Sequence, residues 1–347
     1  MAIQASNVQD LINSTLSKYG RMKFTDIMSR YNKTIAFKRL MKKGKMTFDG
    51  GTKVIWNLLT STNGSARYVG LGVTDVVDIP NVTTQGEIEW KHATFNWAIV
   101  HQMISMNSGS AERIFNLIQS QRIAAFGDWV ILAEQRFWRT PTSTDQVNPN
   151  GVQYWIVKNN TTGFNGATPA GFTVVGNINP STYTRWKNYT AQYTNVTDSD
   201  VVDKMRTCAW EIDFEPLVDE TPVYSAGDDL VLYMNFATLK NLETIARSNN
   251  DQLGFDLDPT SGKTMFRRRV MSPVKELEDD TVNPIYFINW SDFGCIGLEK
   301  EWMRNTVIPV KSDQHNVSVT HTDITHNYIM RDRRKHAVLA TDTTVMA

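Results

Sequence analysis

Short motifs in the sequence contain residue types that hold phosphates in other proteins. Residues Ser261–Thr264 read Ser-Gly-Lys-Thr, the end of a phosphate-binding loop, but the glycine required upstream would fall at Leu257, which cannot make that turn. Gly70 and Gly72 supply two of the three glycines of a dinucleotide-binding turn. No helix start follows them to hold a pyrophosphate. Neither motif therefore predicts a nucleotide site.

The one motif that resembles a cation site lacks the residues required at two of its positions. Asp256, Asp258 and Thr260 begin like a calcium-binding loop, but the sixth position is Ser261 instead of Gly and the twelfth is Arg267 instead of Glu. We therefore expect no tight calcium site.

Histidines gather near the C-terminal end of the sequence, in the set His315, His321, His326 and His336 with Asp323. On a strand, His321 and Asp323 would share one face and His326 would lie on the other, so they would not converge on a metal ion. We expect solvated or hydrogen-bonded side chains here.

The candidate nucleophiles and the candidate acid–base residues do not predict a catalytic site either. Cys208 and Cys295 lack Cys-x-x-Cys or Cys/His spacing, so we expect buried, reduced thiols, and no Gly-x-Ser-x-Gly elbow occurs. Four carboxylates in five positions could supply an acid and a base: Glu276, Glu278, Asp279 and Asp280. Such a run in an exposed loop is typical of a solvated charge cluster, and we expect it to pair with a basic surface such as Arg267–Arg269. We predict no catalytic, cofactor-binding or metal-binding residue, hence no enzyme and no cofactor.

Composition narrows the class of protein. The chain has 347 residues, 41% of them hydrophobic, and its 36 basic and 36 acidic side chains give zero net charge. This excludes a disordered chain and one whose whole surface attracts nucleic acid or membranes. At this length we expect two or more packed units. The sequence has no run of the roughly 20 apolar residues that span a bilayer. Its first residues lack the features of a secretion signal, so we expect synthesis in the cytoplasm without export.

Charge is unevenly distributed. From Lys18 to Lys45 there are ten basic residues and one acidic residue, Asp26, so this segment carries +9 and the remainder −9. Apolar residues within it recur at helical spacing and run towards Gly44: Phe24, Ile27, Met28, Tyr31 and Ile35. We predict a basic helical arm over residues 1–45, which is either a solvated helix face or an arm laid on an acidic partner or nucleic acid.

The next segment predicts an extended hairpin over residues 46–103. Residues Val54–Leu59 alternate as in a strand with apolar groups on both faces. A return strand spans Glu87–Met103, with a shift of phase near Ala93 that is typical of a bulge. The connection, Ser61–Gln85, has too few bulky residues to form its own core, and connections of this length are more often functional loops.

The strongest helix signal begins at Ser110 and ends near Trp138, before Pro141. Its apolar stripe comprises Ile114, Ile118, Ala125, Trp129, Ala133 and Phe137. Glu134 and Arg136 lie off the stripe, so we expect them to face solvent or a neighbour. At 1.5 Å per residue the helix would span roughly 43 Å, which makes it the spine of the subunit.

The remaining elements are mixed. Turn-forming residues dominate Thr140–Pro180, with short strands expected at Val152–Val157 and Phe172–Val175. A helix over Asp198–Trp210, a strand over Leu230–Asn235 and a helix over Phe236–Asn249 follow, and later segments read as further strands. The fold class is therefore α+β.

The order of these elements resembles that of the major capsid proteins of tailed bacteriophages, over nearly the whole chain. Four local phrases carry the likeness: MNSGSAERIFNLI, INPSTYTRWKN, FINWSDFGCIGLEKEW and MRDRRKHAVLA. The resemblance implies a tailed-phage major capsid fold with an N-terminal arm over 1–45 and an extended hairpin loop over 46–103. A spine helix with peripheral-domain elements would occupy 104–180, a mainly axial domain 181–310, and C-terminal strands 311–347.

The resemblance also implies a function. Copies of the chain would assemble into hexamers and pentamers of an icosahedral shell around double-stranded DNA, held by non-specific contact, and the protein would be found in the virion. Partners would be the chain itself, a separate scaffolding protein, a portal and decoration proteins, but no membrane. Some relatives cross-link a hairpin lysine to a neighbour's asparagine, and Lys45, Lys53 and Lys91 are the lysines in position here.

An extended hairpin is not stable alone in water, so a neighbouring subunit should cover it. Two alternatives stay open on sequence grounds. Aromatic, Asn and Thr content also fits a carbohydrate-active enzyme or a lectin-like module. A different phage structural protein, or a cellular shell protein of the same fold, would have the same pattern of elements.

Overall fold

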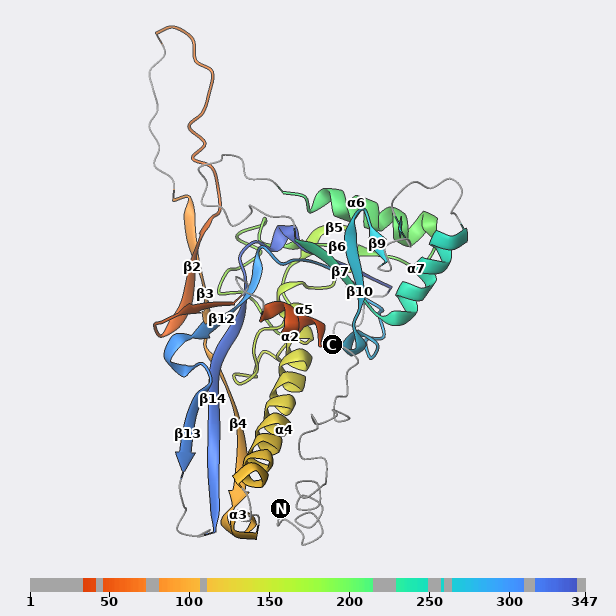
Figure 1. The fold of residues 1–347 in the computed structure, drawn as a ribbon. Coiled ribbons are helices and arrows are strands. Elements are labelled where there is room, and N and C mark those ends of the chain that lie inside the picture. The colour runs from red at the N-terminus through yellow and green to blue at the C-terminus, as the bar shows by residue number, and fades with distance from the viewer. Residues whose placement is uncertain are drawn as a thin grey trace.

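The computed structural model describes residues 34–41, 46–72, 81–106, 111–214, 229–248, 257–258, 264–308 and 316–341 (Figure 1). Most of the predicted basic arm, residues 1–33 and 42–45, lies outside these ranges. The helices are α2 (Ile35–Leu40), α3 (His101–Met106), α4 (Ala111–Trp138), α5 (Val152–Trp155), α6 (Asp203–Glu211) and α7 (Phe236–Ser248).

In the described residues the strands form sheets of eight, five and two strands. The eight-stranded sheet has the order β5-β6-β15-β11-β7-β10-β9-β8. Its strands are β5 (Gly163–Gly166), β6 (Asn188–Gln192), β7 (Leu230–Met234), β8 (Leu257–Asp258), β9 (Met265–Phe266), β10 (Arg269–Pro273), β11 (Ile285–Asn289) and β15 (Ala337–Ala340). The five-stranded sheet contains β1 (Met46–Asp49), β4 (Lys91–Val100), β12 (Phe293–Leu298), β13 (Arg304–Ile308) and β14 (Val317–Met330), and the hairpin contains β2 (Lys53–Leu59) and β3 (Thr83–Glu89).

The eight-stranded sheet separates two cores, because alternate side chains of a strand point to opposite faces. Leu232 of β7 and Phe287 of β11 face α6 and α7 and belong to one apolar cluster. Tyr233 and Tyr286, their neighbours in sequence, face the other way, into the cluster that contains the end of α4. Every residue of β7 and β11 is buried, which explains why these strands read as continuous apolar runs.

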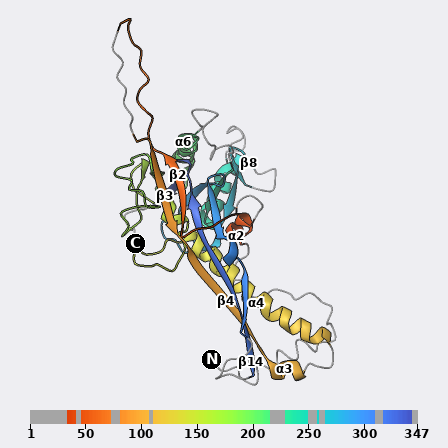
Figure 2. The ribbon, with the colours of Figure 1, turned by 90° about the vertical axis from the view of Figure 1, so that its left-hand side faces the viewer.

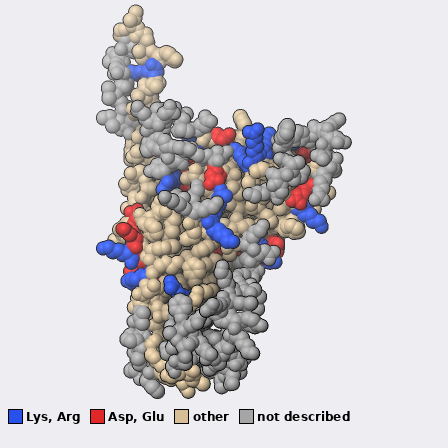
Figure 3. All heavy atoms as spheres, viewed as in Figure 1, with Lys and Arg blue, Asp and Glu red and all other residues tan. Residues whose placement is uncertain are grey.

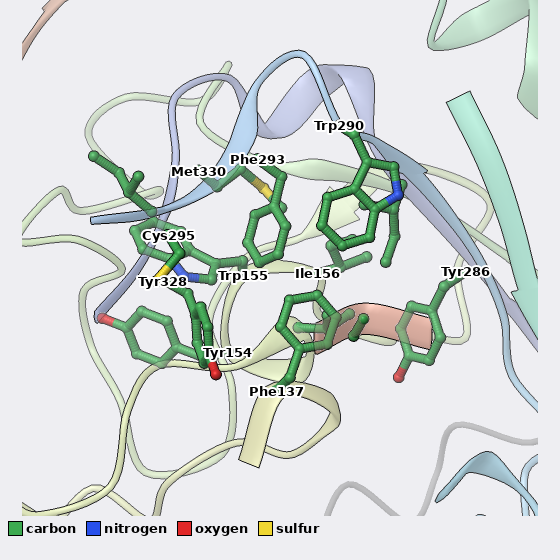
Figure 4. Close-up of a cluster of buried hydrophobic side chains, with 14 of the residues drawn as sticks. Phe137, Tyr154, Trp155, Ile156, Tyr286, Trp290, Phe293, Cys295, Tyr328 and Met330 are labelled. Carbon is green, nitrogen blue, oxygen red and sulfur yellow. The ribbon is translucent and has the colours of Figure 1, made fainter. Parts of the chain in front are cut away.

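The second core is rich in aromatic rings (Figure 4). Phe137 at the end of α4 stacks on Trp290 with 5.7 Å between ring centroids, and it meets Phe293 and Tyr328 edge-on. Tyr154 and Trp155 of α5 complete this cluster. The end of the spine helix is thereby tied to both large sheets.

The strand β14 organises the five-stranded sheet. Residues Val317–His326 pair antiparallel with β4 along one side, while β13 and β12 pair in succession along the other. The β4–β14 ladder extends away from the eight-stranded sheet beside α4 (Figures 1 and 2).

Several sequence predictions are confirmed by these elements. The spine helix is observed as α4, 28 residues long, and it ends before Pro141. The strand over Leu230–Asn235 and the helices over Asp198–Trp210 and Phe236–Asn249 are also present, the former helix opening with a π-helical turn at Asp198–Val202.

Other predictions are wrong in detail. The expected return strand Glu87–Met103 is two strands and a helix: β3 pairs with β2, but after Trp90 the chain turns and β4 pairs with β14. Residues Val152–Val157 begin with the helix α5, and Phe172–Val175 contribute only a bridge at Val175, because buried aromatic packing overrides the alternating pattern. Of the helical pattern that runs from Phe24 towards Gly44, the structure describes α2, which begins after the non-helical residue Thr34; residues 24–33 lie outside the described ranges.

Trp129 on α4 gives a direct test of the spine. The ring is buried between Phe95 of β4, Phe37 of α2 and Trp302, with centroid distances of 6.4, 5.1 and 6.1 Å. Trp129→Ala should lower the free energy of unfolding by about 3–5 kcal/mol, because it leaves a large cavity. Leu132→Ala, at an exposed position of the same helix, is the matched control and should cost about 1 kcal/mol or less. Equal urea midpoints for the two variants would contradict this packing.

Candidate assembly surfaces

The base of the β2–β3 hairpin packs on its own subunit. Val54 and Ile88 are buried, and Trp56 meets Trp155 edge-on with 6.1 Å between ring centroids. Gly86 faces Trp56 across the ladder, where a Cβ atom would come within 2.4 Å of the indole ring. Only glycine lets the two strands and this ring fit together, so the base of the hairpin is fixed to the subunit. The expectation of a hairpin covered by a neighbour does not hold for this part.

The outward face of the same hairpin is different. The strand has apolar groups on both faces, as predicted, but Ile55 and Leu59 on this face are 54% and 66% exposed within the subunit. The rest of this face is polar: Gln85 donates a hydrogen bond of 3.1 Å to Asn57 between the two apolar residues, and Lys53 forms an ion pair of 2.9 Å with Glu87. Such a mixed face is typical of surfaces that another protein covers.

Beyond the ladder the chain projects as a long loop (Figure 1). Its described residues, 60–72 and 81–82, form no helix or strand. Tyr68 and Leu71 are fully exposed there, and Val69 is mostly exposed. Arg67 is the only charged residue in residues 60–72, and the loop looks nearly uncharged where it is described (Figure 3). The loop thus presents apolar side chains far from either core of its own subunit.

Further large apolar side chains are exposed elsewhere in the described chain. They comprise Met41 after α2, Phe48 on β1, Met106 on α3, Ile123, Phe126 and Leu132 on α4, Val147, Trp210 on α6 and Phe236 on α7. They lie on elements spread over the whole molecule, as expected for a subunit with several neighbours.

The phosphate and cation motifs of the sequence do not form sites among the described residues. Ser261–Lys263, Asp256 and Thr260 lie outside them. Thr264 donates a hydrogen bond of 2.6 Å to Glu243, and Gly70 and Gly72 lie in the projecting loop. No group of three or more His, Cys, Asp or Glu side chains in the described part could hold a metal ion.

His321 and Asp323 lie on β14, where Asp323 accepts a hydrogen bond of 3.1 Å from Arg304 of β13. His326, expected to be solvated or hydrogen-bonded, is instead buried, and its Nδ1 has no hydrogen-bond partner in the described structure. Burial lowers the pKa of His326 to about 4.

His336 follows β14 and is fully buried. Its Nδ1 accepts a hydrogen bond of 3.2 Å from the backbone N–H of Asn289, and burial lowers its pKa to about 3. Both histidines are therefore neutral at pH 7. His315 lies outside the described residues.

The acidic run is solvated only in part, since Glu278 and Asp279 are exposed whereas Glu276 and Asp280 pair with basic side chains. Glu276 is buried and forms an ion pair of 2.5 Å with Arg139, at the end of α4. Asp280 contacts Lys158, and Glu278 lies 3.7 Å from Lys275. The basic partners that the structure shows are thus not the expected Arg267–Arg269, because the run folds back onto the loop region after α4.

The structure also shows the surroundings of both cysteines and of two of the three hairpin lysines. Cys208 and Cys295 are free and buried, as predicted, and burial raises the pKa of Cys295 to about 12. Lys91 donates a hydrogen bond of 2.7 Å to the carbonyl of Gln146, and Lys53 pairs with Glu87 on the hairpin. Lys45 lies outside the described residues.

Glu134 and Arg333 are two of the buried charged residues that the sequence pattern does not predict. Glu134 was expected to face solvent, but it is buried and accepts hydrogen bonds from the backbone of α2 and from the Trp138 indole. Arg333 is fully buried and donates to five oxygen atoms of the chain. Neither has a sequence signal, since their partners are mostly backbone groups far along the chain.

In the described residues no helix is both long and apolar enough to cross a membrane. No protein-family model matches the chain, and no curated protein matches it.

The fold itself is found in solved structures of shell-forming proteins. The chain is similar to a subunit in the capsid asymmetric unit of cyanophage A-1(L), with a TM-score of 0.60 and 11% identity over 92% of this chain and 96% of that one. It is also similar to the capsid of an empty GTA particle, with a TM-score of 0.58 and 12% identity over 93% and 95% of the two chains. The holo-SrpI encapsulin complex of Synechococcus elongatus PCC 7942 gives a TM-score of 0.50 and 8% identity over 99% and 98%.

These likenesses, over nearly the whole length of each chain, define a capsid-type fold. The chain has the tailed-phage major capsid fold that the sequence resemblance predicted.

Proposed function

We propose that this chain is the major capsid protein of a tailed bacteriophage. Copies of it assemble into hexamers and pentamers, which close into an icosahedral shell around double-stranded DNA. The protein works through its interfaces and is not an enzyme. It would have the domain division expected from the sequence, with the arm, the hairpin loop, the spine helix and the axial domain each touching neighbours.

The single observation that supports this proposal best is the projecting hairpin loop. Its base is fixed on Trp155 of its own subunit, whereas Tyr68 and Leu71 at its far end are fully exposed. Exposed apolar side chains on a long excursion gain stability only when another surface covers them. A second copy of the chain offers that surface at every position of a closed shell.

Charge supports the same assembly. The segment Lys18–Lys45 carries +9 and the remainder of the chain −9, so the arm of one copy is attracted to its neighbours and to packaged DNA. A scaffolding protein, a portal and decoration proteins complete the proposed partners. The shell is the proposed location of the protein, after its synthesis in the host cytoplasm.

A cellular shell protein is the second candidate, since the fold likeness extends to an encapsulin. The contents of the shells distinguish the two candidates. Shells are purified from cells that make this chain and its natural partner proteins; nucleic acid inside them supports a virus. Shells that hold a protein cargo instead support the second candidate.

Shortening the loop tests the proposal. Thr60 and Val82 are hydrogen-bonded across the hairpin at 2.9 Å, so an Asn-Gly turn can join them in place of residues 61–81. We expect a folded subunit whose melting temperature changes by no more than about 2 °C, because the described residues of the deleted part, 61–72 and 81, are all exposed. The same variant should form no regular shells in electron micrographs.

The double substitution Tyr68→Ser and Leu71→Ser is the matched control, since it keeps the length of the loop and removes only apolar surface. It should weaken assembly and leave the subunit folded. Normal shells from the shortened chain, or an unfolded subunit, would contradict the assignment of the loop to intersubunit contacts.

A further inference from the structure

The first described residues, Thr34 and the helix α2 that follows it, lie against α4. α2 has no side-chain cap of its own at Thr34. Instead, the Glu134 carboxylate accepts the backbone N–H groups of Ala36 and Phe37, at 3.2 and 2.9 Å. Hydrogen bonds to orphan N–H groups are what fix the start of a helix. The segment that precedes Thr34 therefore starts directly beside α4.

An apolar stripe on α4 continues past the place where α2 covers it. The Phe37 ring meets Trp129 and Phe126 edge-on, with centroid distances of 5.1 and 6.5 Å. Phe126 is still 38% exposed, and Ile123, one turn earlier on the same face, is 49% exposed. Figure 2 shows α2 beside one part of α4 and the rest of α4 running on past it. The exposed part of the stripe thus lies next to the point from which the first 33 residues depart.

The sequence just before Thr34 has a face that fits this stripe. Its apolar residues follow the i, i+3, i+4, i+7 spacing of one helix face: Phe24, Ile27, Met28 and Tyr31. As a helix, residues 24–31 would rise about 10 Å, or two turns, which is enough to cover Phe126 and Ile123. Lys23, Arg30 and Lys33 fall off that face and would stay in water.

We propose that residues 24–33 dock as an amphipathic helix on Ile123 and Phe126 of α4 in the same subunit. Direct connection to Thr34 gives this segment a high effective concentration at the stripe, which favours it over a second copy or another protein. In this arrangement α4 covers the apolar face of residues 24–33 and leaves their basic side chains in water. This inference concerns one subunit and does not depend on whether the chain builds shells.

Disulfide trapping tests the docking. Cys208 and Cys295 are both buried, so introduced thiols are the reactive ones. Ile123→Cys is combined in turn with Ile27→Cys, Met28→Cys and Tyr31→Cys, and the dilute full-length chain is oxidised. At least one pair should give an intrachain disulfide, identified by mass spectrometry of the linked peptides, with the mass of a monomer.

Leu132→Cys is the matched control partner for the same three cysteines. Leu132 is 42% exposed but lies nine residues from Ile123, half a turn around α4, so these pairs should give no intrachain disulfide. A covalent dimer through Ile123→Cys would overturn the proposal and identify a second copy as the occupant. Absence of any disulfide at Ile123→Cys, or equal yields at both positions, in variants that melt like the parent chain, would overturn it too.

Discussion

Replacement of Arg333 by methionine should destabilise the subunit by about 5 kcal/mol or more, which is enough to unfold many domains. The fully buried guanidinium donates from Nε to the Trp155 carbonyl at 2.8 Å and from Nη1 to the carbonyls of Ala167 and Trp186 at 2.8 and 2.9 Å. Nη2 donates to the Gly166 carbonyl at 2.9 Å and to Asn188 Oδ1 at 3.2 Å.

The size of this effect follows from what is left behind. The substitution removes the hydrogen bonds to five oxygen atoms, of which Asn188 Oδ1 still accepts from the Val157 N–H at 2.9 Å, and each buried group left unsatisfied costs about 1–3 kcal/mol. Burial lowers the pKa of Arg333 to about 9, so the side chain stays charged at pH 7 and its hydrogen bonds are charge-assisted. In the described residues no carboxylate pairs with it; the charge is held by carbonyl dipoles of the irregular region between α5 and β6.

Arg334→Met is the matched control. Arg334 is the next residue, and its side chain pairs with Asp332 at 2.9 Å and lies over the Phe214 ring instead of entering the core. It should cost about 1 kcal/mol or less, as a partly exposed ion pair does. Arg333→Lys, which keeps the charge but not the fork of donors, should fall between the two. Urea midpoints of the three variants measure this; equal midpoints for Arg333→Met and Arg334→Met would contradict the role of Arg333.

Mild acid should unfold the isolated subunit through two buried histidines. The pKa of His326 is lowered to about 4 and that of His336 to about 3, in both cases mainly by burial. In the unfolded chain both titrate near 6.5. Between pH 6.5 and 4 the unfolded state therefore binds more protons, and stability must fall as the pH falls. The expected loss is about 5 kcal/mol at pH 4.5 for the two residues together, since each pKa unit corresponds to about 1.4 kcal/mol.

The carboxyl groups of Glu134 and Asp145 do not reverse this loss of stability at lower pH. Burial raises the pKa of Glu134, despite hydrogen bonds from Phe37, Trp138 and Ala36, so this residue alone would add stability as the pH falls. The hydrogen bond from Asn148 and neighbouring N–H groups lower the pKa of Asp145, so the stability that this group contributes is lost only at still lower pH. The histidine contribution, with two groups of the same sign, dominates the window from pH 6.5 to 4.5.

His336→Asn isolates one histidine, because an Asn oxygen can accept the Asn289 N–H that Nδ1 accepts now. The variant should show a shallower fall of stability between pH 6.5 and 4.5. His101→Asn on α3, at an exposed position, is the control for the exchange of a histidine for asparagine. Chemical denaturation at several pH values measures the slopes, and a wild-type slope in His336→Asn would contradict the buried, neutral state of His336.

The sequence predicted the elements whose own residues determine them. The 28 residues of α4 have helical periodicity and end before Pro141, so local pattern was sufficient there. The same holds for β7 and α7, which are adjacent in sequence and differ clearly in period. The resemblance to tailed-phage capsid proteins, carried by the order of such elements, gave the correct fold.

Two of the wrong predictions, β4 and Glu134, share one physical cause, which is pairing over long sequence separations. The strand β4 reads as part of a hairpin, but its hydrogen-bond partner β14 lies more than 200 residues away, and period-two alternation does not identify a partner. Glu134 reads as a surface residue because the α2 amides that satisfy it are 97 and 98 residues away. The sequence predicts only part of the candidate assembly surface. The composition of the loop identifies it as a functional loop. The packing of the hairpin base, in which Trp56 contacts Trp155, depends on residues far apart in the sequence and could not be predicted.

The central claim is that this chain builds a closed shell from many copies of itself. Electron microscopy of the purified full-length chain, concentrated at moderate salt, tests it most directly. We expect rings with fivefold or sixfold symmetry and closed shells of uniform diameter. Their yield should change with salt, because exposed charges are screened over about 8 Å at physiological ionic strength. A chain that stays monomeric at every concentration and salt level, while folded, would contradict the account.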